Sequence, residues 1–183
     1  MTERDKMVAG EPYVASDPEL RAARLRARQL TFRYNATPPD AFDERRAVLA
    51  ELCGSVGDGV WIEPPFHCDY GWNIALGDGV FLNFGCAVLD CAPVTIGALT
   101  QIGPSVQIAA ATHPLDPRER QASVEYALPV TIGRNVWIGA AVVVGPGVTI
   151  GDDSVIGAGS VVLRDVPSGV LAVGSPVRVV RDL

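Results

Sequence analysis

One histidine lies where a side chain could do chemistry. His113, in the segment ATHPLDPRER (111–120), follows a regular apolar run and precedes a polar stretch. An imidazole titrates near neutral pH and can take a proton from a hydroxyl group. The second histidine, His67 in FHCDYG, lacks such a setting, and we expect it to be structural. His113 is therefore the candidate general base of this chain.

Three arginines near the C-terminus form a candidate anion site. Arg164 precedes the final segment SPVRVVRDL, in which Arg178 and Arg181 lie three residues apart. Arginine binds phosphate through two parallel hydrogen bonds. A local cluster of this kind can hold an anion although the net charge of the chain is −6.

A six-residue repeat must position these side chains. Downstream, an aliphatic residue recurs at every sixth position, and glycine follows nearly all of them: Ile132, Ile138, Val144, Ile150, Ile156 and Val162. Upstream, the repeat has two phases offset by two residues at DCAP (90–93): Ile96, Ile102 and Ile108, and then Tyr70, Leu76, Leu82 and Val88. Ile62 lies eight residues before Tyr70, which is a second offset.

A period of six fits short strands joined by tight turns. Three hexads form one triangular coil, with each aliphatic side chain inside and stacked on the equivalent residue of the next coil. Glycine permits turn geometry that larger residues resist. The fold class that we predict is therefore mainly β, a parallel β-helix over residues 56–168.

The repeat breaks off between residues 109 and 129. Ile108 and Ile132 are 24 residues apart, or four hexads, so the register is kept across the break. We predict an excursion loop that carries His113, because long loops in compact domains are commonly functional. If Val88 stacks on Ile108, Asp90 lies one coil from Ala110, three residues before His113. Asn83 and Asp90 would then lie on neighbouring faces of the coil below.

The two ends of the chain differ from the repeat. Residues 1–55 are predicted as an N-terminal helical cap, with one helix starting at Ser16 or Asp17 before Pro18 and a second over 39–53. Such helices can cover an open end of the prism or an active site. Residues 169–183 form a C-terminal segment outside the hexad register.

Composition argues against several classes of protein. The acidic net charge disfavours broad nucleic-acid binding. Without eighteen consecutive apolar residues or a signal-peptide pattern, we expect a cytoplasmic protein with no membrane association. The four cysteines form no CxxC pair and are expected to be reduced and packed as small apolar groups.

The motifs resemble those of the hexapeptide-repeat O-acetyltransferases. FHCDYGWNIALGDGVFLNFGCAVLD, ATHPLDP and PVTIGRNVWIG are similar to segments of the maltose, galactoside and nodulation acetyltransferases. CDYG and THPLDP favour the maltose branch, and the resemblance covers nearly the whole chain. It implies a left-handed β-helix, although the general rule for parallel crossovers gives the opposite hand. It also implies a homotrimer with sites between subunits.

The resemblance further implies a reaction and the residues that carry it. Acetyl-CoA would be the donor and a sugar hydroxyl of maltose, glucose or galactoside type the acceptor, with no metal required. His113 would deprotonate the hydroxyl, which attacks the thioester without an acyl-enzyme. Asn83 would act between acceptor and donor, and the acceptor-side residues would be Asp69, Asp90 and Glu125.

On the donor side, the resemblance places residues along a groove for acetyl-CoA. The backbone N–H of Ala140 would stabilise the oxyanion, a role that tolerates any side chain. The remaining donor-side positions are Asn83, Ala158, Leu163, Arg164, Arg178 and Arg181. The arginine cluster found from the sequence thus falls on the phosphate side of the family's site.

Two departures from the family pattern leave the sugar open. Gly85 stands where relatives often carry Asn or Asp, and Ala15 aligns with an acceptor-contacting aspartate of the galactoside branch. One alternative is a hexapeptide acetyltransferase that modifies an antibiotic or another small hydroxyl compound. Another is a non-enzymatic β-helix scaffold. A metal-dependent anhydrase would need three histidine ligands, and the chain has two histidines.

Overall fold

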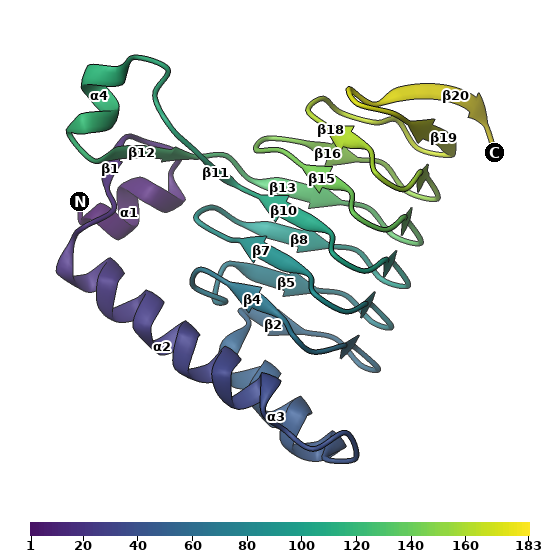
Figure 1. Cartoon of the computed structure of the whole chain (residues 1–183), viewed down its shortest axis with the longest axis horizontal. Helices are drawn as coiled ribbons and strands as arrows, with labels where there is room; N and C mark the ends of the chain where they lie inside the picture. The colour runs from purple at the N-terminus through teal and green to yellow at the C-terminus, as the bar shows by residue number, and fades with distance from the viewer.

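The main body of the protein is a parallel β-helix, seen in a computed structural model that describes all 183 residues (Figure 1). Its strands stack into three faces. Face one contains β2 (Ser55–Val56), β5 (Ile74–Leu76), β8 (Val94–Ile96), β13 (Val130–Ile132) and β16 (Thr149–Ile150). Face two contains β3 (Trp61–Ile62), β6 (Phe81–Leu82), β9 (Gln101–Ile102), β14 (Trp137–Ile138), β17 (Val155–Ile156) and β19 (Val170–Val173). Face three contains β4 (His67–Cys68), β7 (Ala87–Leu89), β10 (Gln107–Ala109), β15 (Val143–Val144) and β18 (Val161–Val162).

Three columns of turns join the faces. We call the turns from face one to face two the first corner, those from face two to face three the second corner, and those from face three back to face one the third corner. The predicted β-helix is confirmed. The wall also continues past the last hexad, because β19 pairs in parallel with β17.

Stacked aliphatic side chains form the core, as the hexads predict. In the upper coils Ile132 lies opposite Ile150, Ile138 opposite Ile156, and Val144 opposite Val162. These side chains are buried, as are most of their counterparts in the lower coils, whereas Val56 and Cys68 of the first coil are partly buried. At the transfer value for apolar surface, each such side chain contributes about 1.5–3 kcal/mol to the stability of the fold. One continuous core therefore runs the length of the β-helix.

The register of the lower coils differs in one place from the predicted phases. Cys68, not Tyr70, lies opposite Val88 on face three. The second offset, predicted between Ile62 and Tyr70, therefore falls after Cys68, at the third corner, directly below the offset at Asp90. Tyr70 belongs to this widened corner rather than to the repeat. The hexad pattern could not distinguish these positions because Tyr70 and Cys68 are both apolar and both lie at an even spacing from Leu76.

The excursion is more ordered than the predicted loop. It consists of β11 (Ala111–Thr112), α4 (Pro117–Gln121) and β12 (Val124–Ala127), with β11 and β12 antiparallel. A strand of the N-terminal segment, β1 (Tyr13–Val14), pairs with the other edge of β12. The resulting three-stranded sheet projects from the β-helix beside α1 (Glu3–Val8) (Figure 1).

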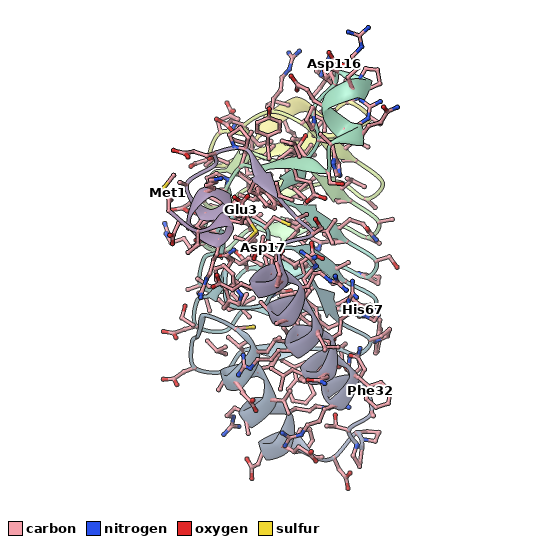
Figure 2. All side chains as sticks on the ribbon, turned by 90° about the vertical axis from the view of Figure 1, so that its left-hand side faces the viewer. Met1, Glu3, Asp17, Phe32, His67 and Asp116 are labelled. Atoms are coloured by element: carbon pink, nitrogen blue, oxygen red, sulfur yellow. The ribbon has the colours of Figure 1, made fainter.

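Two longer helices cover the N-terminal end of the β-helix. α2 (Pro18–Asn35) begins after Asp17, whose carboxylate caps the backbone N–H of Glu19, and α3 (Phe42–Leu52) packs against it. Figure 2 shows α2 running from Asp17 to Phe32 along one side of the molecule. Asn35 donates a hydrogen bond to the carbonyl of Phe66 at 2.9 Å, which ties α2 to the second corner. No helix is long and apolar enough to span a membrane.

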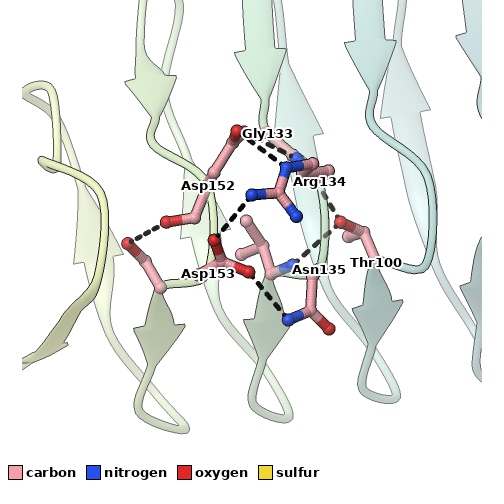
Figure 3. Close-up of polar contacts among 8 residues, drawn as sticks. Thr100, Gly133, Arg134, Asn135, Asp152 and Asp153 are labelled. Carbon is pink, nitrogen blue, oxygen red and sulfur yellow. Dashed lines mark hydrogen bonds and ion pairs between the residues drawn. The ribbon is translucent and has the colours of Figure 1, made fainter. Parts of the chain in front are cut away.

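Polar side chains link successive coils at the first corner (Figure 3). Arg134 pairs with Asp152 at 3.2 Å and Asp153 at 3.1 Å, and Asn135 donates to Asp153 at 2.8 Å. Inside the corner, the buried Thr100 hydroxyl accepts from the N–H of Val136 at 3.0 Å and donates to a carbonyl at 2.8 Å. These contacts satisfy turn groups that the strand ladders leave unpaired.

Replacing Thr100 by valine should destabilise the fold at this corner. The isosteric change leaves the buried N–H of Val136 and the partly buried carbonyl of Gly133 without partners, which costs about 1–3 kcal/mol. Urea unfolding at fixed protomer concentration should show a lower midpoint with the same dependence on denaturant. Thr95→Val is the matched control, because Thr95 is exposed on β8; its effect should stay within about 0.5 kcal/mol. Equal midpoints for the two variants would refute the role of Thr100.

Candidate active site

An open hollow of about 450 Å³ lies beside the third corner, where the excursion leaves the wall. It is formed by the excursion, the segment after β1 and the start of α2. Its lining residues are Ala15, Ser16, Arg21, Arg24, His113, Arg120, Ser123, Val124 and Glu125. The structure therefore brings the predicted residues His113 and Glu125 to one place. The His113 side chain is exposed, so a substrate can reach it.

Glu125 is held by the N-terminal segment. Tyr13 lies opposite Glu125 in the β1–β12 ladder, and its hydroxyl donates to the Glu125 carboxylate at 2.9 Å. The Tyr13 side chain is almost completely buried, and burial is the main cause that raises the pKa of its phenol. The phenol therefore remains a hydrogen-bond donor at neutral pH. A residue 112 positions away in the sequence thus fixes the carboxylate beside His113.

Asp90 lies at the third corner but does not line the hollow, and its predicted contact with the acceptor stays a prediction. Its side chain is fully buried. One carboxylate oxygen accepts from the N–H groups of Asp69 and Tyr70 at 3.1 and 2.8 Å, and the other accepts from Asn73 at 3.3 Å. Asp90 therefore caps the widened turn of the coil below. Burial raises the pKa of Asp90 to about 6, although these hydrogen bonds oppose the shift.

Asp69 lies partly buried beside this cap. Its carboxylate accepts a hydrogen bond from the thiol of Cys91 at 3.5 Å, and burial raises its pKa while the nearby Arg24 opposes the increase. Asp69 is at the third corner, as predicted, but it does not line the hollow. Its predicted contact with the acceptor stays a prediction.

Asn83 lies at the second corner and is not part of the hollow. Its side-chain oxygen accepts from the N–H of Phe84 at 2.7 Å. β7 crosses the whole of face three between Asn83 and Asp90, and six intervening residues can extend over roughly 20 Å. Asn83 and Asp90 both lie in the coil below His113, as predicted, because β6 pairs with β9 and β7 with β10. Within one chain, however, Asn83 lies at the other edge of face three from His113. It shares its corner instead with the predicted donor-side residues Ala140 and Ala158.

The second corner presents free backbone donors. The carbonyl of Ala140 accepts from Gly159 at 2.8 Å, whereas the N–H groups of Ala140 and Ala158 donate no backbone hydrogen bond. The next residue, Ala141, has a positive φ of 56°. This left-handed turn directs the chain back into β15. Unpaired N–H groups of this kind are suited to an anionic or carbonyl oxygen.

The predicted anion cluster contains two arginines on one side of a strand. Arg178 and Arg181 belong to β20 (Arg178–Asp182), which pairs antiparallel with β19. Residues three apart normally point to opposite faces. Here a bulge shifts the register, so Arg178 and Arg181 lie opposite Val173 and Leu171, which are two apart. The bulge therefore puts both guanidinium groups on the same face, and both are exposed.

Leu163 and Arg164 lie apart from this pair. They follow β18 and are exposed at the third corner, on the same edge of face three as the hollow but two coils above β10. The predicted donor-side residues therefore lie in three places: Asn83, Ala140 and Ala158 at the second corner, Leu163 and Arg164 at the third corner, and Arg178 and Arg181 on β20.

Sequence reasoning missed residues that the N-terminal segment contributes. Arg24 donates to the Tyr70 hydroxyl and to the carbonyl of Ala15, both at 2.6 Å, and lines the hollow. Tyr13 holds Glu125, and Arg21 and Arg120 also line the hollow. The helical pattern of α2 was recognisable, but the sequence contained no signal for the β1–β12 pairing that brings these residues to His113.

Comparison with known proteins identifies the family. Residues 6–57 match the maltose acetyltransferase hexapeptide capping motif, and residues 129–164 match the six-repeat bacterial transferase hexapeptide model. The chain is 53% identical to nodulation protein L of Rhizobium meliloti, over 97% of both chains. The chain belongs to the maltose and galactoside O-acetyltransferase family.

Solved structures of the same family superpose on the whole chain. A maltose O-acetyltransferase from Clostridium difficile has a TM-score of 0.99 at 44% identity, covering 100% of this chain and 98% of that one. A galactoside acetyltransferase in complex with coenzyme A has a TM-score of 0.96 at 40% identity, covering 100% and 91%. This acetyltransferase therefore shares both the β-helix and the capping segment of its relatives.

Asp90 should make stability depend on pH. Its folded pKa of about 6 exceeds the usual unfolded value of about 3.9, so its contribution is fully present below about pH 4 and is lost as pH rises through 6. The shift corresponds to about 3 kcal/mol at most. The wild-type free energy of unfolding should thus fall relative to Asp90→Asn between pH 4 and 7, as measured by urea titration. Parallel pH profiles would contradict this assignment.

Replacing Tyr13 by phenylalanine should loosen the excursion. Loss of the hydrogen bond to Glu125 removes about 1 kcal/mol, so amide hydrogen exchange in β12 should accelerate about fivefold. Tyr126→Phe is the matched control. Tyr126 lies in β12 itself, and its hydroxyl makes no hydrogen bond to the chain. If both variants exchange at the same rate, Tyr13 does not hold the excursion.

Proposed function

We propose that this protein transfers an acetyl group from acetyl-CoA to a sugar hydroxyl, with His113 as the general base. The observation that carries the proposal is the exposed imidazole of His113 in an open hollow at the edge of a rigid wall. The family membership supports the same reaction class. Relatives named for maltose and galactoside support a sugar acceptor.

The reaction needs a general base and a hydrogen-bond donor that stabilises the negative charge developing on the thioester oxygen. His113 takes the proton of the hydroxyl as its oxygen attacks the thioester carbonyl. The carbonyl oxygen becomes an oxyanion, for which the free N–H of Ala140 is the candidate donor. The C–S bond then breaks, and the thiolate takes the proton from the imidazolium. The products are the acetyl ester and the free thiol of coenzyme A.

Direct attack on the thioester agrees with the state of the nearby thiol. Cys91 is buried, and burial raises its pKa to about 12. A thiol in this state is a poor nucleophile, because the thiolate is the reactive form. The proposed route therefore has no acyl-enzyme on Cys91.

Acetyl-CoA is the proposed donor because this chain has residues suited to its nucleotide phosphates and to its pantetheine arm. Arg178 and Arg181 on one face of β20 suit the nucleotide phosphates, with Arg164 nearby in the sequence. Ala158 and Leu163 are exposed and suit the pantetheine arm. The complex of the galactoside acetyltransferase with coenzyme A supports this assignment.

We further propose a homotrimer whose active sites lie between subunits. In one chain, His113 and Glu125 lie at the third corner, whereas Asn83 and Ala140 lie at the second corner on the other edge of face three. A three-fold arrangement would place the second corner of one subunit against the third corner of the next. Each site would then combine the base from one chain with the oxyanion donor from its neighbour.

The test is acetyl-CoA-dependent thiol release with glucose, maltose and a methyl galactoside as acceptors. His113→Ala should lower kcat/KM by about 10²–10⁴, the usual contribution of a general base. His67→Asn is the matched control and should retain activity within about twofold. Circular dichroism of both variants checks that they fold. Thiol release that is unchanged in His113→Ala would refute the mechanism, and no release with any acceptor would refute the function.

A further inference from the structure

The arginines of this protein fall into two classes by their partners. Of fifteen lysines and arginines, only Lys6 is lysine, so the remaining fourteen are arginines. Five of them pair with carboxylates: Arg4, Arg26, Arg33, Arg46 and Arg134. Arg45 is buried against Thr37. The other eight have no carboxylate within ion-pair distance, although the chain as a whole is acidic.

These eight arginines form two groups along the chain. One group belongs to the C-terminal part of the chain and is accounted for by the phosphates of the proposed donor: Arg164, Arg178 and Arg181. The other group lies on α2 and on α4 of the excursion: Arg21, Arg24, Arg28, Arg118 and Arg120. The proposed donor supplies no partner for this second group.

Three members of the second group line the hollow that contains His113: Arg21, Arg24 and Arg120. Arg24 and Arg120 are held in place by neutral oxygen atoms only. Arg24 donates to a hydroxyl and a carbonyl, and Arg120 donates to the carbonyls of Pro114 and Leu115 at 2.9 and 2.7 Å. A guanidinium has five N–H groups, so each keeps donors for another ligand. The guanidinium of Arg21 makes no hydrogen bond or ion pair within the chain, so its charge is not neutralised there.

The acidic groups near the hollow leave an excess of positive charge. Glu125 is the only carboxylate in the lining, and it already accepts a hydrogen bond from Tyr13. Asp69 lies outside the lining; burial raises its pKa, and the charges of Arg24 and Arg28 only oppose this rise. Three guanidinium groups therefore face one lining carboxylate. A neutral sugar needs no such excess, whereas an anionic group does.

We propose that the preferred acceptor is a hydroxyl compound that carries an anionic oxygen group, such as a phosphate monoester, bound by Arg21, Arg24 and Arg120. This inference rests on the proposed acetyl transfer and specifies the acceptor class. The anionic group anchors the acceptor while one of its hydroxyls reaches His113. The two unpaired arginine groups then bind the two substrates: the C-terminal group binds the donor and the hollow binds the acceptor.

The experiment compares matched acceptors in the thiol-release assay at low ionic strength. Glucose is paired with glucose 6-phosphate, galactose with galactose 1-phosphate and with galacturonate, which separates phosphate from carboxylate. We expect kcat/KM to be at least about tenfold higher for an anionic member than for its neutral partner, and this ratio to fall as salt is added. Arg21→Gln should lower the ratio about three- to tenfold, and Arg21→Glu should lower it further.

Arg118→Gln is the matched control. Arg118 is also an exposed, unpaired arginine on the excursion, but it does not line the hollow, so the ratio should be unchanged. Neutral acceptors that react as fast as all their anionic partners would overturn the inference and leave the proposed acetyl transfer intact. An anionic preference that survives in Arg21→Glu would also overturn it. Absence of thiol release with every acceptor would refute the proposed function and this inference with it.

Discussion

The stacking of identical aliphatic positions from coil to coil is the constraint on which this structure depends. Each inward side chain can be buried only if the coil above places another apolar side chain directly over it. A change of coil length is therefore tolerated only at a corner. Both two-residue insertions of the lower coils fall at the third corner, and the excursion leaves there as well. The same corner thus carries the irregular residues available for function.

The stability of this corner depends on polar groups that the wall buries. Asp90 has no exposed surface, yet it satisfies three backbone N–H groups of the widened turn below it. The N-terminal segment stabilises the corner from outside, through the β1–β12 ladder and the contacts of Arg24. The capping segment therefore does more than shield the open end of the β-helix, since it builds one wall of the hollow around His113.

The groups needed for the proposed reaction lie on two different edges of face three. The third corner holds His113, the proposed base, and its surrounding charged groups, and the second corner holds the free backbone donors. Because the parallel strands of face three separate them, a single chain does not assemble the proposed reaction. Association of identical chains offers a direct way to join these edges, and the acidic net charge is compatible with two local arginine groups for anionic substrate parts.

The sequence by itself determined the β-helix and the interruption that carries His113, because a period of six and a break that keeps register are visible in the residues alone. Arg178 and Arg181 were recognisable as a pair, but only the bulge in β20 places them on one face. The register of Cys68, the burial of Asp90 and the separation of Asn83 from His113 were decided by tertiary structure. So was the joining of Tyr13 to Glu125, because pairing between distant segments leaves no periodic signal in the chain.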